Sequence, residues 1–194
     1  MSAPETDALD RADMARLCSG HDAALNDLME RHAAPVFHFL CRMLGSEDDA
    51  NDLAQETFVR VFRSRDSFRA GAKFSTWLFT IAANLARSQI RWRGRHPNIS
   101  LDAESETIGQ SLGDLLPSDG RPPDGELVVR ERTSAVRRTV AQLPDDMREA
   151  IVLCELEDKA VAEAAAILKT TPKAVESRLY RARQLLRQRL AKWL

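Results

Sequence analysis

The stretch DDANDLAQETFVRVFRSRDSFRAGAKFSTWLFTIAANLARSQIRWRGR, residues 48–95, reads as two amphipathic helices joined by a short loop. In its first half, apolar residues recur at helical spacing and define one buried face: Ala50, Leu53, Ala54, Phe58, Val61 and Phe62. Residues 47–56 contain five carboxylates and no Lys or Arg. The second half, from Phe74 onward, has no acid and closes on arginines, namely Arg87, Arg91, Arg93 and Arg95. One compact unit therefore has an acidic end and a basic end.

The composition is that of an ordinary globular protein of one or two small domains. The chain has 194 residues, of which 44% are hydrophobic and 29% are charged. No apolar run approaches the roughly 20 residues that a membrane helix needs. The acidic N-terminus lacks the features of a signal peptide. We therefore expect a cytoplasmic protein without membrane insertion.

The cysteines and histidines predict neither a disulfide framework nor a metal site. Cys18, Cys41 and Cys154 lie far apart in apolar helical contexts, so buried core thiols are the leading interpretation. A redox-sensing role stays open as an alternative, although no basic cluster is placed to lower a thiol pKa. The four histidines show no metal-ligand spacing. We expect no metal and no cofactor.

Two further helices are expected before the central stretch. Residues 7–19 form a short helix, and a longer one begins near Asp22. Pro35 lies inside the apolar repeat of the longer helix and should kink or split it, because proline lacks the N–H and clashes with the preceding turn. Gly45 is the expected C-cap of that helix, and Ser46 is the expected N-cap of the acidic one.

Residues 96–125 have the composition of a linker. They hold four of the eight prolines and four of the eight glycines, and acids outnumber bases. About 30 flexible residues span roughly 30 Å, which would let two small domains reach separate sites. The predicted fold is all-α, with one helical domain over residues 1–95, the acidic linker over 96–125 and a second helical domain over 126–194.

The second domain ends in the pattern of a helix-turn-helix. One helix ends before Pro144 and another covers residues 145–157. The motif itself begins with a helix over 160–168, and Thr171 then caps a second helix that has proline at its first position. The face of this second helix opposite its apolar stripe is polar and basic, as a DNA-recognition helix requires: Lys173, Glu176, Ser177, Tyr180, Arg181 and Gln184.

Two separate motifs resemble one protein family. DANDLAQETFVRVFRS and FSTWLFTIAANLARSQIRWRGR are similar to region 2 of bacterial sigma-70 factors, in their extracytoplasmic-function (ECF) branch, and ESRLYRARQLLR is similar to region 4. The resemblance covers about residues 21–95 and 126–192. It implies a transcription initiation factor, not an enzyme, that binds core RNA polymerase and promoter DNA and takes no small-molecule substrate. It also implies an anti-sigma partner, and it places the acidic linker near the polymerase active site.

The resemblance assigns three sets of contact residues. Docking on core polymerase falls on the acidic helix, at Asp48, Asp49, Asp52, Leu53, Gln55, Glu56 and Val59. Contacts to the −10 element, with a pocket for an extruded base framed by the loop 69–73 and Asn84, fall at Phe68, Arg69, Lys73, Phe74, Trp77, Asn84, Arg87, Arg91 and Arg93. Contacts to the −35 element fall at Lys173, Glu176, Ser177, Arg178, Tyr180, Arg181 and Arg183. Aromatic faces that stack on bases and cations that hold phosphates suit single-stranded DNA.

Simpler interpretations of these residues stay open. First-turn carboxylates also stabilise a helix through its dipole, Trp77 shares a face with core residues, and a basic helix end can simply be solvated. Lys169 stands at the turn position where helix-turn-helix motifs favour glycine, and a left-handed conformation there costs about 1 kcal/mol. Glu176 replaces a frequently basic residue and could accept a hydrogen bond from cytosine N4. The approach to the motif at 158–161 also departs from the family pattern.

Two other functions remain as alternatives. The first is a stand-alone DNA-binding regulator that uses only the helix-turn-helix, and polymerase-independent binding to duplex DNA would favour it. The second is an interaction protein that does not touch DNA, whereas the arginine clusters predict a steep salt dependence of DNA binding. If an anti-sigma partner exists, its docking surfaces are predicted at residues 47–62 and 134–157.

Overall fold

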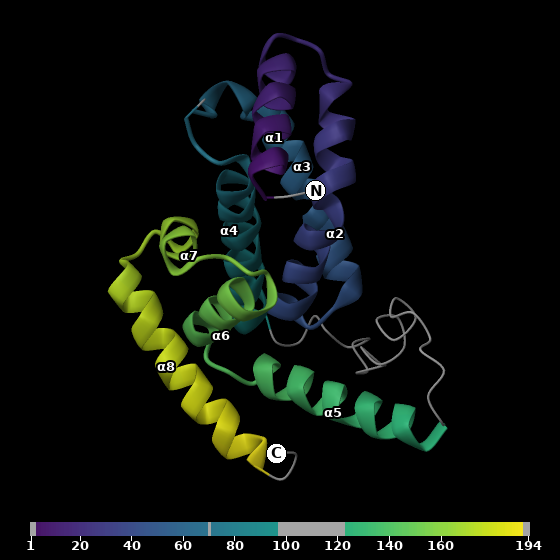
Figure 1. The fold of residues 1–194 in the computed structure, drawn as a ribbon, viewed down its shortest axis with the longest axis vertical. Helices are drawn as coiled ribbons and strands as arrows, with labels where there is room; N and C mark the ends of the chain where they lie inside the picture. Colours follow the sequence, from purple (N-terminus) through teal and green to yellow (C-terminus); the bar gives the residue numbers. More distant parts are fainter. Residues whose placement is uncertain (1–2, 70, 97–122, 192–194) are drawn as a thin grey trace.

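The computed structural model describes residues 3–69, 71–96 and 123–191, and within these ranges it is all-α, as predicted (Figure 1). Most of the predicted linker therefore lies outside the described residues. The helices are α1 (Ala3–Cys18), α2 (Ala24–Leu44), α3 (Glu47–Arg63), α4 (Phe74–Arg95), α5 (Pro123–Ala141), α6 (Asp145–Ile151), α7 (Val161–Leu168) and α8 (Pro172–Arg189). A 3₁₀ turn, η1 (Arg65–Ser67), follows α3, and a π-helical turn, η2 (Val152–Leu156), extends α6.

Helices α1 to α4 form an N-terminal unit around one hydrophobic core. α2 packs along α3 and α4, and α1 runs beside the upper part of α2 and also contacts α4 (Figure 1). The largest fully buried side chains of this unit come from α1, α2 and α4 and include Leu17, Leu28, Phe39, Phe74 and Phe79. The rings of Phe39 and Phe79 meet edge to face with centroids 5.4 Å apart, a favoured aromatic geometry.

Pro35 does not split α2, contrary to one of the two expected outcomes. The helix runs without a break from Ala24 to Leu44. Leu28 before the proline and Phe39 after it are both fully buried in the same core. Burial of each such side chain contributes about 2 kcal/mol, so packing on both sides offsets the hydrogen bond that proline removes.

The C-terminal end of α2 and the N-terminal start of α3 are both capped by residues next to them in the sequence. Gly45 adopts the left-handed conformation (φ +69°), and its N–H donates to the carbonyl of Cys41 at 2.9 Å. The hydroxyl of Ser46 accepts from the backbone N–H of Asp49 at 3.3 Å. Both predicted caps are therefore confirmed, and they fix the sharp corner between α2 and α3.

Buried ion pairs that the sequence analysis did not anticipate fasten α1 to α2. Asp10 is 1% exposed and accepts from Arg31 Nε at 3.0 Å, and its other oxygen lies 2.8 Å from His32 Nε2. Asp13 bonds Arg31 Nη2 at 2.5 Å. Burial opposes the charge on Arg31, but the two carboxylates outweigh it and raise the pKa of the guanidinium. Removal of either carboxylate would leave the half-buried Arg31 with one ionic partner instead of two.

Helices α5 to α8 form a C-terminal unit that contains the helix-turn-helix. α7 and α8 meet at a turn where Lys169 adopts the left-handed conformation (φ +52°, ψ +48°). The Thr171 hydroxyl accepts from the N–H of Ala174 at 3.2 Å, which confirms the predicted cap. The helix predicted over 145–157 is α6 continued by η2, so its extent is confirmed but its last turn is π-helical.

We expect Lys169→Gly to stabilise the chain. The left-handed conformation costs a residue with a Cβ about 1 kcal/mol, and glycine adopts it without that strain. The free energy of unfolding in urea should therefore rise by about 1 kcal/mol. Ala166→Gly, on the exposed side of the same helix, is the matched control and should lower it by a similar amount. A fall for both variants would show that the Lys169 side chain itself stabilises the turn.

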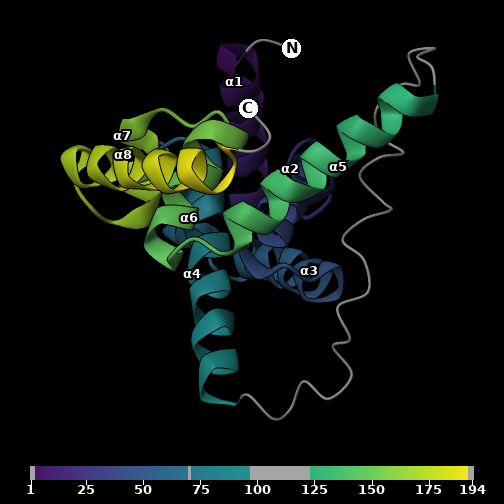
Figure 2. The ribbon, with the colours of Figure 1, turned by 90° about the horizontal axis from the view of Figure 1, so that it is seen from below.

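The two units pack side by side and share one continuous cluster of buried residues (Figures 1 and 2). α7 lies against α4, and charged groups cross the boundary. Arg87 of α4 bonds both oxygens of Glu149, and Lys73 bonds Glu163 at 2.7 Å. Further contacts that join the units include Arg42 with Glu157, Arg148 Nη1 with the Met43 carbonyl at 2.7 Å, and Lys159 over the Phe79 ring at 4.6 Å.

Glu157 should make stability depend on pH. Burial raises the pKa of its carboxyl to about 7, although Arg42 and Lys159 act in the opposite direction. The folded chain then holds a proton more tightly than the unfolded chain, whose carboxyl keeps a pKa near 4.5. The free energy of unfolding should therefore fall as the pH rises from about 4.5 to about 7. Glu157→Gln should flatten this fall in urea titrations. The exposed Glu155→Gln is the control, and equal slopes in wild type and Glu157→Gln would contradict the prediction.

Candidate docking and nucleic-acid interfaces

α3 presents a solvent-facing stripe made by Asp48, Asp52, Gln55 and Val59. Their spacing of four, three and four residues places them within an arc of about 60° on one side of the helix. All four are exposed, and Val59 keeps 40% of its surface in water. Phe58 and Val61 point to the core on the other side. An apolar group surrounded by carboxylates suits a protein partner with a basic, partly apolar groove.

The other predicted docking residues have contacts within the chain. Asp49 pairs with Arg93 and accepts from Gln89 Nε2 at 3.3 Å, both on α4. Glu56 accepts from Arg60 Nε at 2.7 Å, one turn along α3. Leu53 is half-buried against the core. These three residues flank the stripe rather than form its centre.

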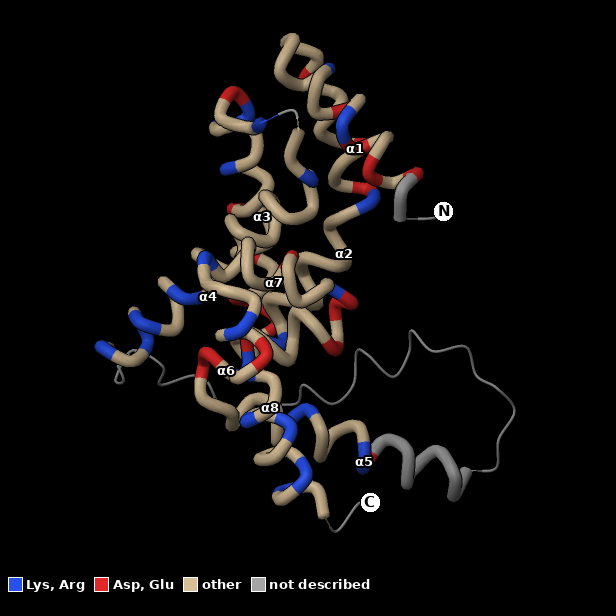
Figure 3. Tube along the Cα trace, turned by 60° about the vertical axis from the view of Figure 1, so that its left-hand side comes forward, with Lys and Arg blue, Asp and Glu red and all other residues tan. Residues whose placement is uncertain are grey.

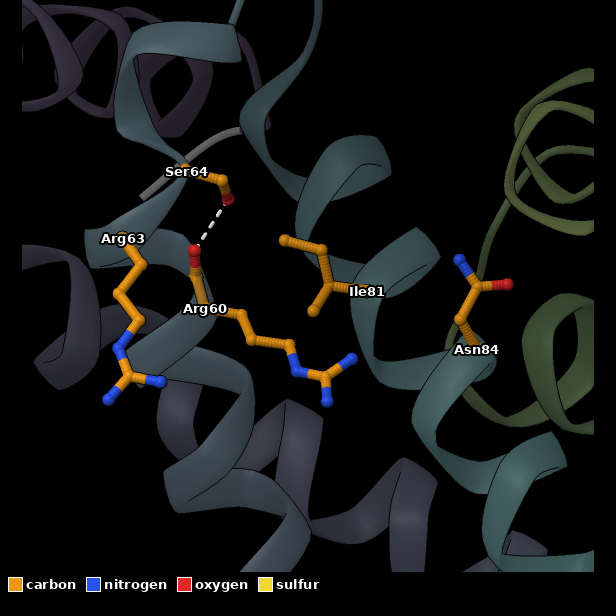
Figure 4. Close-up of a pocket in the computed structure, with 5 residues that line it drawn as sticks. All are labelled: Arg60, Arg63, Ser64, Ile81 and Asn84. Carbon is orange, nitrogen blue, oxygen red and sulfur yellow. Dashed lines mark hydrogen bonds between the residues drawn. The ribbon is translucent and has the colours of Figure 1, made fainter.

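A pocket of about 280 Å³ opens between the end of α3 and the middle of α4 (Figure 4). Arg60 and Arg63 of α3 and the following Ser64 line one side, and Ile81 and Asn84 of α4 line the other. Figure 4 shows the Arg60 side chain extending from α3 toward α4. The site combines two cations, a hydroxyl, an apolar side chain and an amide. These are the groups that would hold a planar base and its phosphates.

Asn84 is shared between this pocket and the predicted base site, whereas Arg60, Arg63 and Ser64 were not among the predicted contacts. The described residues of the loop 69–73 do not line this pocket. Arg60 and Arg63 lie three residues apart and are both exposed, so the helical period of α3 could have pointed to them. Their position opposite Asn84 depends on how α3 packs on α4.

The aromatic residues near the loop form a cluster. Phe74 is 1% exposed and belongs to the core, so it cannot stack on a base in this arrangement. The half-buried Phe68 ring packs against Phe74 and Trp77, with centroids 6.2 and 5.2 Å away. Arg69 is exposed beside this cluster. The cluster fastens the loop onto α4, which is the alternative role that the sequence analysis left open for Trp77.

The basic residues of α4 divide into bonded and open groups. Arg87 is held by Glu149, and Arg93 donates to the Leu44 carbonyl at 3.0 Å as well as to Asp49. Lys73, just before the helix, bonds Glu163, and this hydrogen bond raises the pKa of the lysine. Arg91 is exposed, with its guanidinium 3.2 Å from the Ser88 hydroxyl. In this arrangement only Arg91 of the four is fully open to a ligand.

α8 offers an open polar face, on which basic residues are spread along the helix (Figure 3). Tyr180 is 66% exposed at its centre. Two predicted contact residues on its flanks have partners in the same unit: Arg178 lies 3.4 Å from Asp146, and Arg183 pairs with Glu155. The exposed side chains of this face are Lys173, Glu176, Ser177, Tyr180 and Arg181.

The described residues contain no group of three His, Cys, Asp or Glu side chains placed to hold a metal ion. None of the described helices is both long and apolar enough to cross a membrane. Cys18 is exposed, which corrects the expectation of three buried thiols, and its sulfur lies 3.4 Å from the Arg65 carbonyl. Burial raises the pKa of Cys41 to about 11, away from a reactive thiolate.

Together these features define an all-α protein with an exposed acidic stripe on α3, a polar pocket between α3 and α4, and a helix-turn-helix. Residues 28–96 match the family model of Sigma-70 region 2, and residues 133–186 match that of Sigma-70, region 4. The chain is 34% identical over 172 residues to the ECF RNA polymerase sigma factor SigW of Bacillus subtilis, covering 88% of this chain and 91% of SigW. It is 33% identical to the ECF RNA polymerase sigma-E factor of Haemophilus influenzae, covering 93% and 95%.

Solved structures agree with the sequence relatives. The structure of CnrH in complex with the cytosolic domain of CnrY aligns with a TM-score of 0.70 at 28% identity, covering 95% of this chain and 98% of that one. The sigma factor RpoE in complex with the anti-sigma factor NepR from Bartonella quintana aligns with a TM-score of 0.67 at 27% identity, covering 87% and 98%. The chain belongs to the ECF branch of the sigma-70 family.

Proposed function

We propose that this chain directs core RNA polymerase to promoters through three surfaces. The α3 stripe docks on polymerase, the pocket between α3 and α4 captures a base of the −10 element, and the open face of α8 reads the −35 element. The domain division at 1–95, 96–125 and 126–194 is part of this proposal. The factor would act as a binding protein, not as an enzyme, and in the cytoplasm with polymerase.

The pocket is the observation that carries the proposal. Arg60 and Arg63 would hold phosphates, Ile81 would pack on the face of the base, and the Asn84 amide would bond its edge. Extrusion of a base from duplex DNA costs a few kcal/mol in lost stacking and pairing. A pocket that binds only the extruded base shifts the equilibrium toward melted DNA by the free energy of that binding. No hydrolysis is needed.

The C-terminal unit would supply upstream contacts. The N-terminal end of a recognition helix enters the major groove, and here that end carries Lys173, Glu176 and Ser177. Arg181 and Arg178 would hold flanking phosphates, which position the helix without reading sequence. Glu176 would favour cytosine, because a carboxylate can accept from N4 but repels phosphate.

An anti-sigma partner is the second element of the proposal. Two similar solved structures are complexes of this kind, one with the anti-sigma factor NepR and one with the cytosolic domain of CnrY. In this chain, Val136 and Leu156 are 42% and 39% exposed within the surface 134–157. Together with Val59 on α3, they offer apolar anchors to a partner. The absence of amide-exchange protection at 47–62 and 134–157 in a purified complex would contradict these surfaces.

Run-off transcription on a promoter library tests the proposal. Wild type with core polymerase should give specific transcripts that core alone does not. Asn84→Ala should reduce them about tenfold through the lost base contact, whereas Asn26→Ala, an exposed asparagine on α2, should not. If no transcripts form and the free chain binds duplex DNA tightly, the chain is a stand-alone helix-turn-helix regulator.

A further inference from the structure

Beyond the pocket, one face of α4 stays open to solvent up to the end of the helix. Asn84, Ser88, Arg91, Trp92 and Arg95 lie within an arc of about 100° when the helix is viewed along its axis. The last four are all exposed. Arg87, which bonds the C-terminal unit, lies outside this arc. A surface therefore continues from the pocket toward the C-terminal end of α4.

An exposed aromatic pair ends this surface. Trp92 keeps 40% of its surface in water and is not among the residues packed on the hydrophobic core. The His96 ring stacks on it, with centroids 5.0 Å apart and planes inclined by 25°. His96 Nδ1 lies 2.9 Å from the Trp92 carbonyl, which holds the imidazole in place. The pair is ordered, yet packing of the described core does not account for it.

Cations surround the pair. Arg91 and Arg95 are exposed one position before and three positions after Trp92, and the Arg95 Nε bonds the Arg91 carbonyl at 3.3 Å. Figure 3 shows basic residues along this end of α4, and no acid follows in the helix. An aromatic face with flanking arginines is the arrangement that binds single-stranded nucleic acid, because bases stack on the ring while cations hold the phosphates.

We propose that Trp92 and His96 form a second stacking platform for promoter DNA, which holds the base at the edge of the melted segment. Inside a duplex both faces of a base are covered, so melting exposes the face that an indole can take. Eight residues of helix separate Asn84 from Trp92, a rise of about 12 Å. At the roughly 3.4 Å rise of stacked nucleotides, a strand that stays stacked between the two sites would place the platform three to four nucleotides from the base in the pocket. This register rests on the proposed function of the pocket.

Fork-junction DNA bound by the complex of the full chain with core polymerase provides the test. A long probe extends at least five nucleotides to either side of the pocket base, and a short probe ends two nucleotides from it. Trp92→Ala should weaken binding of the long probe about tenfold and leave the short probe unchanged. Trp92→Phe should retain most of the affinity, since a phenyl ring still stacks. Leu9→Ala, which truncates an exposed apolar side chain on α1, is the control.

A 2-aminopurine base placed three or four nucleotides to each side of the pocket base reports the contact directly. Stacking on Trp92 should quench its fluorescence on one side only, and Trp92→Ala should restore it. Unchanged affinity for the long probe, or an equal loss on both probes, would overturn the platform. Asn84→Ala tests the pocket independently of the platform. If this substitution weakens binding of neither probe, the proposed base pocket is contradicted, whatever the effect of Trp92→Ala.

Discussion

The double substitution Asp52→Arg/Val59→Arg should reduce run-off transcription with core polymerase about 100-fold or more. Both residues lie on the exposed stripe of α3, and neither is buried. The first change reverses a charge at the proposed interface, and the second places a cation where the only large apolar side chain of the stripe lies. Central anchor residues of an interface contribute 2 kcal/mol or more each, so loss of two removes most of the binding.

Glu30→Arg/Ala34→Arg is the matched control for this experiment. It also introduces two arginines in place of an acid and an apolar residue, on the exposed side of α2. Its transcription should stay near the wild-type level. Direct binding of labelled core polymerase should fall for the α3 variant alone, while the circular dichroism spectra of all three proteins agree. Normal transcription by the α3 variant would exclude the stripe as a docking surface.

The second large effect concerns the boundary between the two units. Glu149→Gln/Glu163→Gln should raise the affinity of the free chain for a single-stranded −10 oligonucleotide by at least about tenfold. Glu149 is 5% exposed and holds Arg87, while Glu163 holds Lys73. Loss of one partner of a buried ion pair typically costs 3–5 kcal/mol, and separation of the units relieves this cost by hydrating Arg87. Arg87 then becomes available to phosphates, and, among the described residues, Lys73 keeps only its longer ionic contact with Asp7 at 3.6 Å.

The proposed contacts to both promoter elements also require the two units to separate. The two elements lie roughly 25 base pairs apart, which is about 85 Å of duplex. A compact chain of this length has a radius of gyration of about 16 Å, so its closed form cannot contact both elements. Small-angle scattering should therefore show a larger radius for the double variant. The control Glu131→Gln/Glu155→Gln removes two exposed carboxylates outside the boundary. A larger radius without tighter DNA binding would contradict the role of Lys73 and Arg87.

Much of the local structure could be predicted from the sequence, because it depends on neighbours in the chain. Gly45, Ser46 and Thr171 cap helices through bonds that span three or four residues. The helical period of α3 also predicts which of its sides is exposed. The period does not indicate a partner, and the prediction that Asp52 and Val59 dock on polymerase depends on the resemblance to sigma-70 region 2.

The contacts between distant segments could not be predicted in this way. The helical period of α4 places Phe74 on its apolar face. Its full burial depends on residues of other helices that pack around it, which the period does not predict. Arg60 entered the pocket because α3 crosses α4 at that turn, and Glu149 reached Arg87 across 62 residues of sequence. The sequence of one helix predicts which of its faces is buried. It does not predict which other helix packs on that face.

The closed boundary also bears on how the factor finds polymerase in a crowded cell. Genomic DNA offers millions of non-specific sites, and each phosphate contact strengthens binding to all of them. Pairing Lys73 and Arg87 with carboxylates of the same chain withholds two such contacts. A closed factor would therefore spend less time on random DNA and more time free to diffuse. Its cations would become available at the promoter, where polymerase already holds the chain.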